Sequence, residues 1–322
     1  MTLVGISHPE SELPRYFSPE DLARLQAVAD IRILGNDRPA ALSQLGDVDI
    51  LLGSWGMFRA DIELLTAAPR LKAICYAAGS VKNFVTPESF ARGVLITTAM
   101  HANAIPVAET TTALITLVNK GWFIARERMQ VLKAPPNTPT CGNFGTVVGL
   151  VGFGAIARLV AQKLLTMDIQ LLIYDPYAKD LPPGVESVGL LELARRAAVI
   201  SLHAPDIPAT HGMCGTEFFA AMRDGATIIN TARGRLIDES ALIAELRTGR
   251  IYAHLDVTHP EPAPPNSPFY TLPNVWLTPH YAGSNGNEIQ RLGRYAIDEC
   301  LEFIAGKPPR YPVTEAMLPT MA

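Results

Sequence analysis

The chain has 322 residues, of which 48% are apolar and 18% are charged. This length suits two domains of ordinary size, and the apolar content excludes a disordered or collagen-like chain. A net charge of −4 argues against a nucleic-acid partner, because such proteins carry basic patches that bind phosphates.

The sequence also predicts no membrane span, since its apolar stretches are broken well before the roughly 20 residues that a bilayer requires. Residues 1–17 contain Glu10 and Glu12 in place of a basic start and an apolar core, so we expect no secretory signal and a cytoplasmic location. The cysteines lie far apart without a C-x-x-C pattern, which predicts neither a disulfide framework nor a metal site. They are Cys75, Cys141, Cys214 and Cys300.

The first third of the chain alternates short apolar runs with amphipathic segments, a rhythm typical of βαβ units around a parallel sheet. Helices are expected over residues 19–30 and 61–68. Strands are expected over residues 2–6, 31–34, 49–52, 71–75 and 94–97.

A long helix is predicted over residues 107–132, and its apolar content is too high for a solvated helix. Six further strands follow, which is enough for a second doubly wound sheet. An i, i+3, i+4 apolar pattern over residues 287–305 predicts a closing amphipathic helix. The six strands are expected over residues 146–151, 170–174, 199–203, 226–230, 253–257 and 275–278.

A glycine-rich turn follows the first strand of the second sheet, where residues 152–157 read Gly-Phe-Gly-Ala-Ile-Ala. Gly152 permits a tight turn, and Gly154 lets a pyrophosphate approach the backbone. Ala155 and Ile156 begin a helix whose N-terminal N–H groups suit phosphate oxygens. The strand, turn and helix together predict a dinucleotide site, although flavin and S-adenosylmethionine enzymes share much of this pattern.

Asp175 follows the next strand, 21 residues beyond Gly154, where an acid binds the ribose hydroxyls of a dinucleotide. A carboxylate there repels a 2′-phosphate. The position therefore favours NAD over NADP.

Three later loops of this sheet carry an arginine, a carboxylate and a histidine. Arg233, Glu261 and His280 each follow a predicted strand. Because the carboxyl ends of parallel strands meet at one edge of a sheet, we expect these side chains to share a crevice beside the dinucleotide.

The sequence resembles the D-isomer-specific 2-hydroxyacid dehydrogenase family, which includes phosphoglycerate, glycerate and D-lactate dehydrogenases. The resemblance runs nearly end to end. The matching motifs are GLVGFGAIA at 149–157, YDPY at 174–177, SLHAP at 201–205, NTARGRLIDE at 230–239, LDVTHPEP at 255–262 and TPHYAG at 278–283.

The resemblance implies a role for each residue of this trio. Arg233 would bind the substrate carboxylate and polarise the C2 oxygen, since a guanidinium offers paired donors. His280 would protonate that oxygen as hydride arrives, and Glu261 would orient the imidazole. Asp256 would hold the nicotinamide carboxamide. The rest of the cofactor cleft would be lined by Thr111, His203, Pro205, Thr231 and Ala232.

In the first domain, residues 76–83 align with the family loop whose N–H groups bind the substrate carboxylate, which implies this role for Gly79 and Ser80. The family has an aspartate where Lys82 stands, and an arginine-serine pair near Trp55. Without that arginine a distal phosphate lacks a partner, while Trp55 offers an apolar wall. An unphosphorylated 2-keto acid is therefore favoured over phosphoglycerate.

The resemblance implies an α/β fold of two doubly wound parallel-sheet domains. A Rossmann NAD-binding domain at 105–287 would be inserted in a flavodoxin-like substrate domain at 1–104 and 288–322. A homodimer is expected through the apolar helix at 107–132.

The function expected is an NAD-dependent exchange of hydride between a 2-keto acid and a D-2-hydroxy acid. An NAD(H)-sensing corepressor-like binding protein on the same fold is the alternative. Formate oxidation is a third reading, but that branch carries a Gln-His pair where Pro279 precedes His280.

Overall fold

A computed structural model describes residues 1–133 and 142–321, so Cys141 and Ala322 lie outside the described part. The chain divides into two compact units. Unit 1 comprises Met1–Asn103 with Ser284–Met321, and unit 2 comprises Ala104–Gly283. The chain passes from unit 1 to unit 2 after Asn103 and returns after Gly283. The sequence predicted these two boundaries after residues 104 and 287, so the observed ones lie one and four residues earlier.

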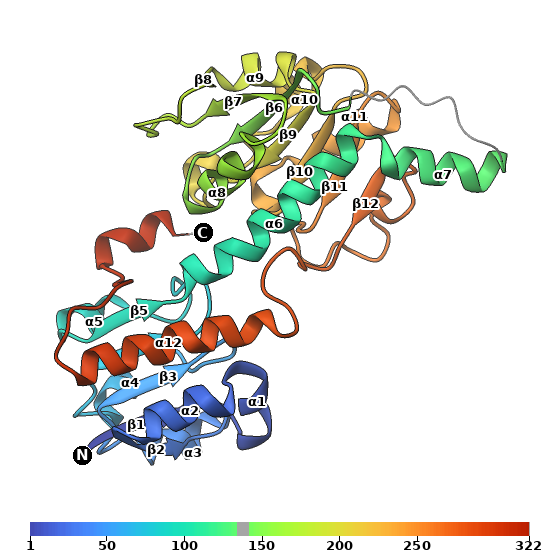
Figure 1. Ribbon diagram of the computed structural model, residues 1–322. Helices are drawn as coiled ribbons and strands as arrows, with labels where there is room; N and C mark the ends of the chain where they lie inside the picture. The colour runs from blue at the N-terminus through green and yellow to red at the C-terminus, as the bar shows by residue number, and fades with distance from the viewer. Residues whose placement is uncertain (134–141, 322) are drawn as a thin grey trace. The chain divides into compact units, whose positions relative to one another are not determined.

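Unit 1 is built on five parallel strands in the order β2-β1-β3-β4-β5, the flavodoxin-like order (Figure 1). The strands are β1 (Thr2–Ile6), β2 (Ala29–Ile33), β3 (Ile50–Gly53), β4 (Ala73–Tyr76) and β5 (Leu95–Thr98). The helices are α1 (Leu13–Tyr16), α2 (Pro19–Gln26), α3 (Arg38–Leu42), α4 (Ile62–Ala67), α5 (Pro87–Ala91) and α12 (Glu288–Ile304).

Both faces of this sheet are buried, because alternate side chains of each strand point to opposite cores. Ile50 and Leu52 pack with α1, α2 and α12, whereas Leu51 packs with α3 and α4. The predicted amphipathic helix near the C-terminus is therefore confirmed as α12, and its apolar stripe covers one face of the sheet formed by the first third of the chain.

Unit 2 contains seven parallel strands in the order β12-β11-β10-β9-β6-β7-β8, the doubly wound Rossmann order with one extra strand. They are β6 (Thr146–Val151), β7 (Ile169–Tyr174), β8 (Val185–Ser187), β9 (Val199–Leu202), β10 (Thr227–Asn230), β11 (Tyr252–Leu255) and β12 (Val275–Leu277). The apolar pattern did not predict β8, a three-residue edge strand whose Glu186 and Ser187 are exposed and give no apolar run.

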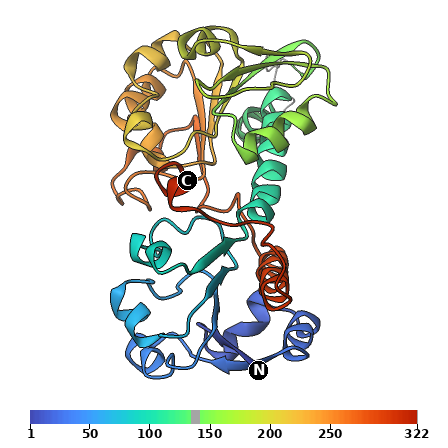
Figure 2. The same cartoon turned by 90° about the vertical axis from the view of Figure 1, so that its left-hand side faces the viewer.

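Helices cover both faces of this second sheet, as Figure 2 shows. On one face, α9 (Leu190–Arg196), α10 (Thr216–Ala221) and α11 (Glu239–Arg247) pack over the strands. On the other face, α8 (Ala155–Leu164) and the second half of α6 (Met100–Asn119) bury Val160, Leu164 and Ile115. The α/β fold with two doubly wound parallel sheets is thus confirmed.

The prediction of one long helix over residues 107–132 is wrong, because two helices occupy this stretch. α6 begins earlier, at Met100, and ends at Asn119, and α7 spans Trp122–Leu132. The break falls at Gly121, whose φ of 62° is a left-handed conformation that ends a helix and that glycine adopts without strain. Apolar periodicity alone did not reveal this stop.

No helix in the described part of the chain combines the length and the apolar content that crossing a membrane requires.

Candidate active site

The carboxyl ends of the unit 2 strands lie in register, so the loops that follow them leave the sheet at one edge. Val151 of β6 pairs with Tyr174 of β7 and Leu202 of β9, Leu202 pairs with Asn230 of β10, and Asn230 pairs with Leu255 of β11. The unit 2 residues with predicted cofactor or catalytic roles lie in these loops or at the start of α8. The one exception among them is Thr111, which lies in α6.

The two glycines of the dinucleotide turn differ in what surrounds them. A Cβ on Gly152 would lie 2.6 Å from the backbone nitrogen of Ala204, and the φ of Gly152 is 91°, so no other residue fits. A Cβ on Gly154 would meet nothing within 4 Å among the described residues. Gly152 is therefore required by packing, and Gly154 leaves open space in front of the backbone.

The N-terminus of α8 lies directly behind this open space. Gly154 is its N-cap, and no described side chain caps the helix, so the N–H groups of Ala155 and Ile156 remain for another acceptor. Such a helix end attracts phosphate oxygens.

Asp175 ties the end of β7 to the glycine turn. Its Oδ2 accepts the N–H of Phe153 at 2.7 Å, and its Oδ1 accepts the N–H of Tyr177 at 2.8 Å. An ionised carboxylate has about four acceptor positions, so two remain for ribose hydroxyls.

The other predicted cofactor residues lie around the same edge. The hydroxyls of Thr111 and Thr231 are 2.9 Å apart and buried, which ties α6 to the loop after β10. His203 Nε2 lies 3.0 Å from the Ser201 hydroxyl, and burial lowers the pKa of His203 to about 4, so the ring is neutral. The Pro205 carbonyl accepts the Thr210 hydroxyl.

Arg233 is a half-buried cation with no ion pair among the described residues. Its Nη1 donates to the carbonyl of Ala232 at 2.7 Å, and its other N–H groups remain for a ligand. Burial lowers the pKa of Arg233, and the charges of Glu261 and Asp206 oppose this effect. The arrangement suits an incoming carboxylate, which would supply the missing charge.

Asn230 fixes the backbone on which Arg233 stands. Its Nδ2 donates to the Arg233 carbonyl at 2.9 Å, and its Oδ1 accepts the Ala232 N–H at 3.0 Å. The motif at 230–239 includes Asn230 but did not predict this role. A polar side chain at the end of a buried strand was the available signal.

Glu261 and His280 form the hydrogen bond expected of an acid–orienter pair. Glu261 Oε1 lies 2.7 Å from His280 Nδ1, and both side chains are a little under half exposed. The ring then presents Nε2 away from the carboxylate, and Nε2 has no hydrogen-bond partner in the described part of the chain. The φ of His280 is 58°, a left-handed conformation that non-glycine residues rarely adopt away from functional loops.

Asp256 builds the loop that carries His280. Its Oδ1 accepts the Thr278 hydroxyl and the Tyr281 N–H, and its Oδ2 accepts the Ala282 N–H at 2.9 Å. The Asp256 carbonyl also accepts the His280 N–H. Three of about four carboxylate acceptor positions are thus used, which leaves one for a ligand amide.

The residues present fit an NAD molecule. Gly152, the open space at Gly154 and the uncapped end of α8 suit the pyrophosphate, and Asp175 suits the adenosine ribose.

The substrate residues predicted in the first domain lie in unit 1. Trp55 follows β3 and is 39% exposed. Gly79 and Ser80 follow β4, where the Gly79 carbonyl accepts the Thr98 hydroxyl and the Ser80 hydroxyl accepts the Lys82 N–H at 3.3 Å. Their roles toward a substrate remain predictions.

Among residues 1–133 and 142–321, no group of three His, Cys, Asp or Glu side chains is arranged to hold a metal ion. The described cysteines, Cys75, Cys214 and Cys300, are buried and unpaired by disulfides.

Together, the Rossmann sheet, the glycine turn and the acid at the end of β7 define unit 2 as a dinucleotide-binding domain. Residues 112–282 match the family model described as "D-isomer specific 2-hydroxyacid dehydrogenase, NAD binding domain". The chain therefore belongs to the D-isomer specific 2-hydroxyacid dehydrogenase family, as the motifs predicted.

Individual proteins show the same similarity. The chain is 33% identical over 299 residues to D-3-phosphoglycerate dehydrogenase of Mycobacterium bovis, covering 90% of this chain and 56% of that protein. It is 30% identical over 260 residues to glyoxylate reductase of Korarchaeum cryptofilum, and the match covers 77% of this chain and 78% of that protein. The TT0316 protein of Thermus thermophilus matches with a TM-score of 0.79 and 29% identity over 97% of this chain and 100% of that one. The chain thus spans just over half the length of the phosphoglycerate dehydrogenase.

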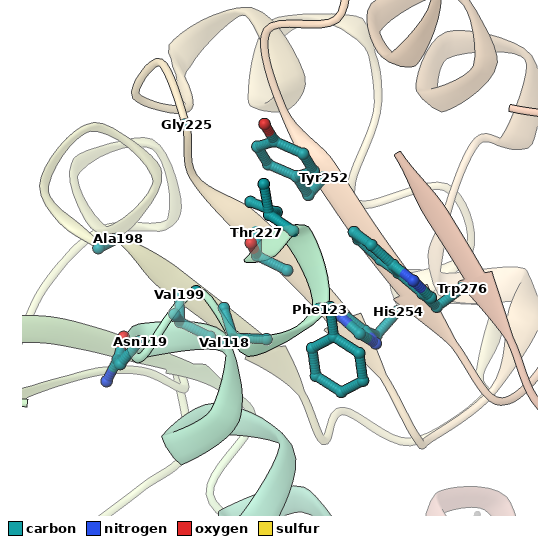
Figure 3. A pocket seen from close by; sticks show the side chains of 12 residues that line it. Val118, Asn119, Phe123, Ala198, Val199, Gly225, Thr227, Tyr252, His254 and Trp276 are labelled. Atoms are coloured by element: carbon teal, nitrogen blue, oxygen red, sulfur yellow. The ribbon is translucent and has the colours of Figure 1, made fainter. Parts of the chain in front are cut away.

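A small cavity of about 50 Å³ lies at the opposite edge of the unit 2 sheet, near the amino-terminal ends of β9, β10 and β11 (Figure 3). His254 there is 6% exposed and stacks on Trp276, with ring centroids 4.6 Å apart, while the Phe123 ring lies 4.3 Å away. Burial lowers the pKa of His254 to about 4. The cavity lies where the end of α6 and the start of α7 meet the sheet, and it does not belong to the site described above.

This burial predicts that acid destabilises the protein through His254. An unfolded histidine has a pKa near 6.5, so between that pH and about 4 only the unfolded state takes up the proton. The folding free energy contributed by His254 should therefore fall by about 2–3 kcal/mol between pH 7 and about pH 4.5. Urea unfolding of wild type and His254→Phe at both pH values measures this, because the phenylalanine stacks without titrating. Equal pH dependence in the two proteins would contradict it.

Proposed function

We propose that this chain is an NAD-dependent oxidoreductase that exchanges hydride between the nicotinamide and C2 of a 2-keto acid or D-2-hydroxy acid. The observation that carries the proposal is the 2.7 Å bond between Glu261 and His280, which leaves His280 Nε2 available at the same sheet edge as the unpaired Arg233 and the dinucleotide turn. Family membership and the NAD binding domain match support it.

The chain's own residues supply binding and proton transfer. Arg233 binds the substrate carboxylate and draws electron density from the C2 oxygen. The nicotinamide, when bound, donates or accepts the hydride at C2. His280 Nε2 gives its proton to the C2 oxygen during reduction, and Glu261 stabilises the imidazolium and holds the ring in place. In oxidation the same nitrogen, neutral, takes the proton from the hydroxyl.

We propose an unphosphorylated 2-keto acid as the substrate, with unit 1 as the substrate domain. Trp55 is partly exposed at the end of β3, where the family carries an arginine-serine pair. An indole offers an apolar wall in place of a partner for a distal phosphate. Gly79 and Ser80 would contribute to carboxylate binding. The cytoplasm remains the predicted compartment.

A panel of 2-keto acids with NADH, followed by loss of NADH absorbance, tests the proposed activity. Turnover of glyoxylate, pyruvate or a larger keto acid supports it, and faster turnover of 3-phosphohydroxypyruvate would refute the substrate class. Tight NADH binding without turnover of any acid would favour the corepressor-like alternative. The Glu261–His280 bond favours the enzyme, because sensing a dinucleotide needs no proton donor.

The cofactor preference follows from the charge of Asp175. Replacing it with asparagine keeps an oxygen for the Phe153 N–H but removes the repulsion of a 2′-phosphate. We expect wild type to prefer NADH, and Asp175→Asn to narrow the preference by about 10- to 100-fold, or roughly 1.4–2.7 kcal/mol. Steady-state kinetics with both cofactors measures this, with Asp175→Ala as a second variant. A wild-type preference for NADPH would refute the assignment.

We further propose a homodimer, now through α7. Part of the apolar stretch expected at 107–132 is not available to a second copy, because Ile115 is 1% exposed and Leu114 and Val118 pack against the core of unit 2. None of the residues of α7 is buried. Its exposed apolar side chains are Trp122 (62%), Met129 (47%), Val131 (81%) and Leu132 (59%).

Sedimentation tests this association. At micromolar concentration we expect twice the chain mass of 34.8 kDa, because apolar side chains on a projecting helix gain by burial against a second copy. Val131→Glu should shift the protein toward the monomer. A wild-type monomer at this concentration would refute the dimer.

A further inference from the structure

Glu239 is a half-buried carboxylate at the start of α11, and its role is not explained by the trio. Its Oε1 accepts the backbone N–H of His259 at 2.7 Å. Burial raises the pKa of Glu239, and the hydrogen bond and charge of His259 oppose this. The carboxylate therefore fixes a backbone position two residues before Glu261.

The same loop is held from a second direction by Gly234, the residue after Arg233. A Cβ on Gly234 would lie 2.1 Å from the carbonyl carbon of Thr258 and 2.6 Å from the His259 nitrogen. The backbone that carries Arg233 thus packs directly on the peptide between Thr258 and His259. Glu239 and Gly234 both act on this one peptide.

Burial does not hold the segment that carries Glu261. Asp256, Val257 and Thr258 are buried at the start of the loop over residues 256–262, whereas the side chains from His259 to Pro262 are exposed. Within the loop, the Thr258 hydroxyl donates to the Pro260 carbonyl at 2.8 Å. Glu239 and Gly234 therefore fix the backbone at the point where the buried part of the loop ends, two residues before Glu261.

We propose that Glu239 is a positioning residue for the acid–orienter pair: by fixing the His259 backbone, it holds Glu261 within hydrogen-bond distance of His280 Nδ1. This inference rests on the proposed function, because it matters only if His280 transfers the proton. A charged acceptor suits the task, since charge-assisted hydrogen bonds are shorter and stronger than neutral ones. The groups that face this anchor are the His259 ring and Arg235, whose Nε lies 3.4 Å from His259 Nε2.

The test compares three variants on the same helix. Glu239→Ala removes the anchor, and Glu239→Gln keeps an oxygen acceptor without the charge. Glu245→Ala is the matched control, because Glu245 is a partly buried carboxylate of α11 that pairs with Arg250 and does not contact the loop. Circular dichroism melting confirms that each variant is folded.

The first readout needs neither cofactor nor substrate. The ring nitrogen chemical shifts of His280 in the free protein are followed by NMR, with His280→Ala used to assign the signals, because they report which ring nitrogen carries the proton. If Glu239 positions Glu261, Nδ1 of His280 in Glu239→Ala loses its carboxylate partner, and the ring shifts away from the tautomer with the proton on Nδ1. Glu239→Gln should lie between the two, and Glu245→Ala should match wild type.

The second readout is the pH profile of reductive kcat/KM with NADH. Glu239→Ala should lower it by about 10- to 100-fold, as a displaced catalytic geometry does, and move the alkaline fall to lower pH. In a Glu261→Gln background the same alanine should have little further effect, because both changes remove one interaction. Additive losses would show that Glu239 does not act through Glu261.

The outcomes separate this inference from the proposed function. If wild type reduces no 2-keto acid, the proposed function fails, while the nitrogen chemical shifts of His280 still report on the anchor. If wild type is active but Glu239→Ala keeps the wild-type chemical shifts and pH profile, the positioning role is wrong.

Discussion

Replacing His280 with alanine is expected to lower kcat for keto-acid reduction by about 10²- to 10⁴-fold, the range typical of a lost general acid. NADH affinity should remain nearly unchanged, because the ring acts in the chemical step. Stopped-flow turnover and NADH fluorescence titration measure the two effects. His101→Ala is the matched control, since this exposed histidine lies at the start of α6, outside the loops that carry the trio.

The direction of the pH dependence adds a second constraint on His280. Reduction requires the imidazolium and oxidation requires the neutral ring, so reduction should fade as pH rises and oxidation should grow. Parallel trends in the two directions, or a His101→Ala variant as impaired as His280→Ala, would refute the assignment of the acid.

Replacing Arg233 with glutamine should reduce kcat/KM by about 10²- to 10³-fold, with KM rising and kcat falling together. The guanidinium both binds the carboxylate and polarises the C2 oxygen. In other enzymes, removing one hydrogen-bond donor to the reacting oxygen lowers the rate by a similar factor. Arg233→Lys should recover part of the loss in KM, because the charge remains while the paired geometry is lost.

Arg247→Gln serves as the control for Arg233, since Arg247 lies exposed at the end of α11. Steady-state kinetics with a saturating cofactor separates kcat from KM. An Arg233→Gln variant that changed KM alone would show that the arginine binds the substrate without assisting the reaction.

The fold could be predicted largely because both sheets are buried on both faces. Their strands then read as apolar runs, and β1 and β6 have the bounds expected from the sequence. The short edge strand β8 carries no such run. The break between α6 and α7 depends on one glycine, Gly121, and an isolated glycine inside an apolar pattern is a weak stop signal.

Some residues of the site could be predicted from the sequence and others could not. The motifs predicted the pairing of Glu261 with His280, which the structure places 2.7 Å apart. They did not predict a role for Asn230 or Glu239, whose partners are backbone groups. Those of Asn230 lie in the turn that follows it, and that of Glu239 lies in the loop after β11. Backbone contacts of this kind leave no residue pattern in the partner segment. The substrate roles of Trp55, Gly79 and Ser80 remain predictions.

Unit 1 is built from two segments that lie far apart in the sequence, and this has a consequence for synthesis on the ribosome. Unit 2 is one continuous stretch, so its contacts form as soon as residue 283 has emerged. Unit 1 needs α12, whose Leu292 and Ile297 cover one face of a sheet completed some two hundred residues earlier. Until α12 emerges, apolar side chains such as Ile50 and Leu52 have α1 and α2 beside them but lack the third helix that covers them. Residues 1–103 are therefore made before unit 2 but completed after it, and their uncovered apolar surface makes them prone to aggregation during that interval.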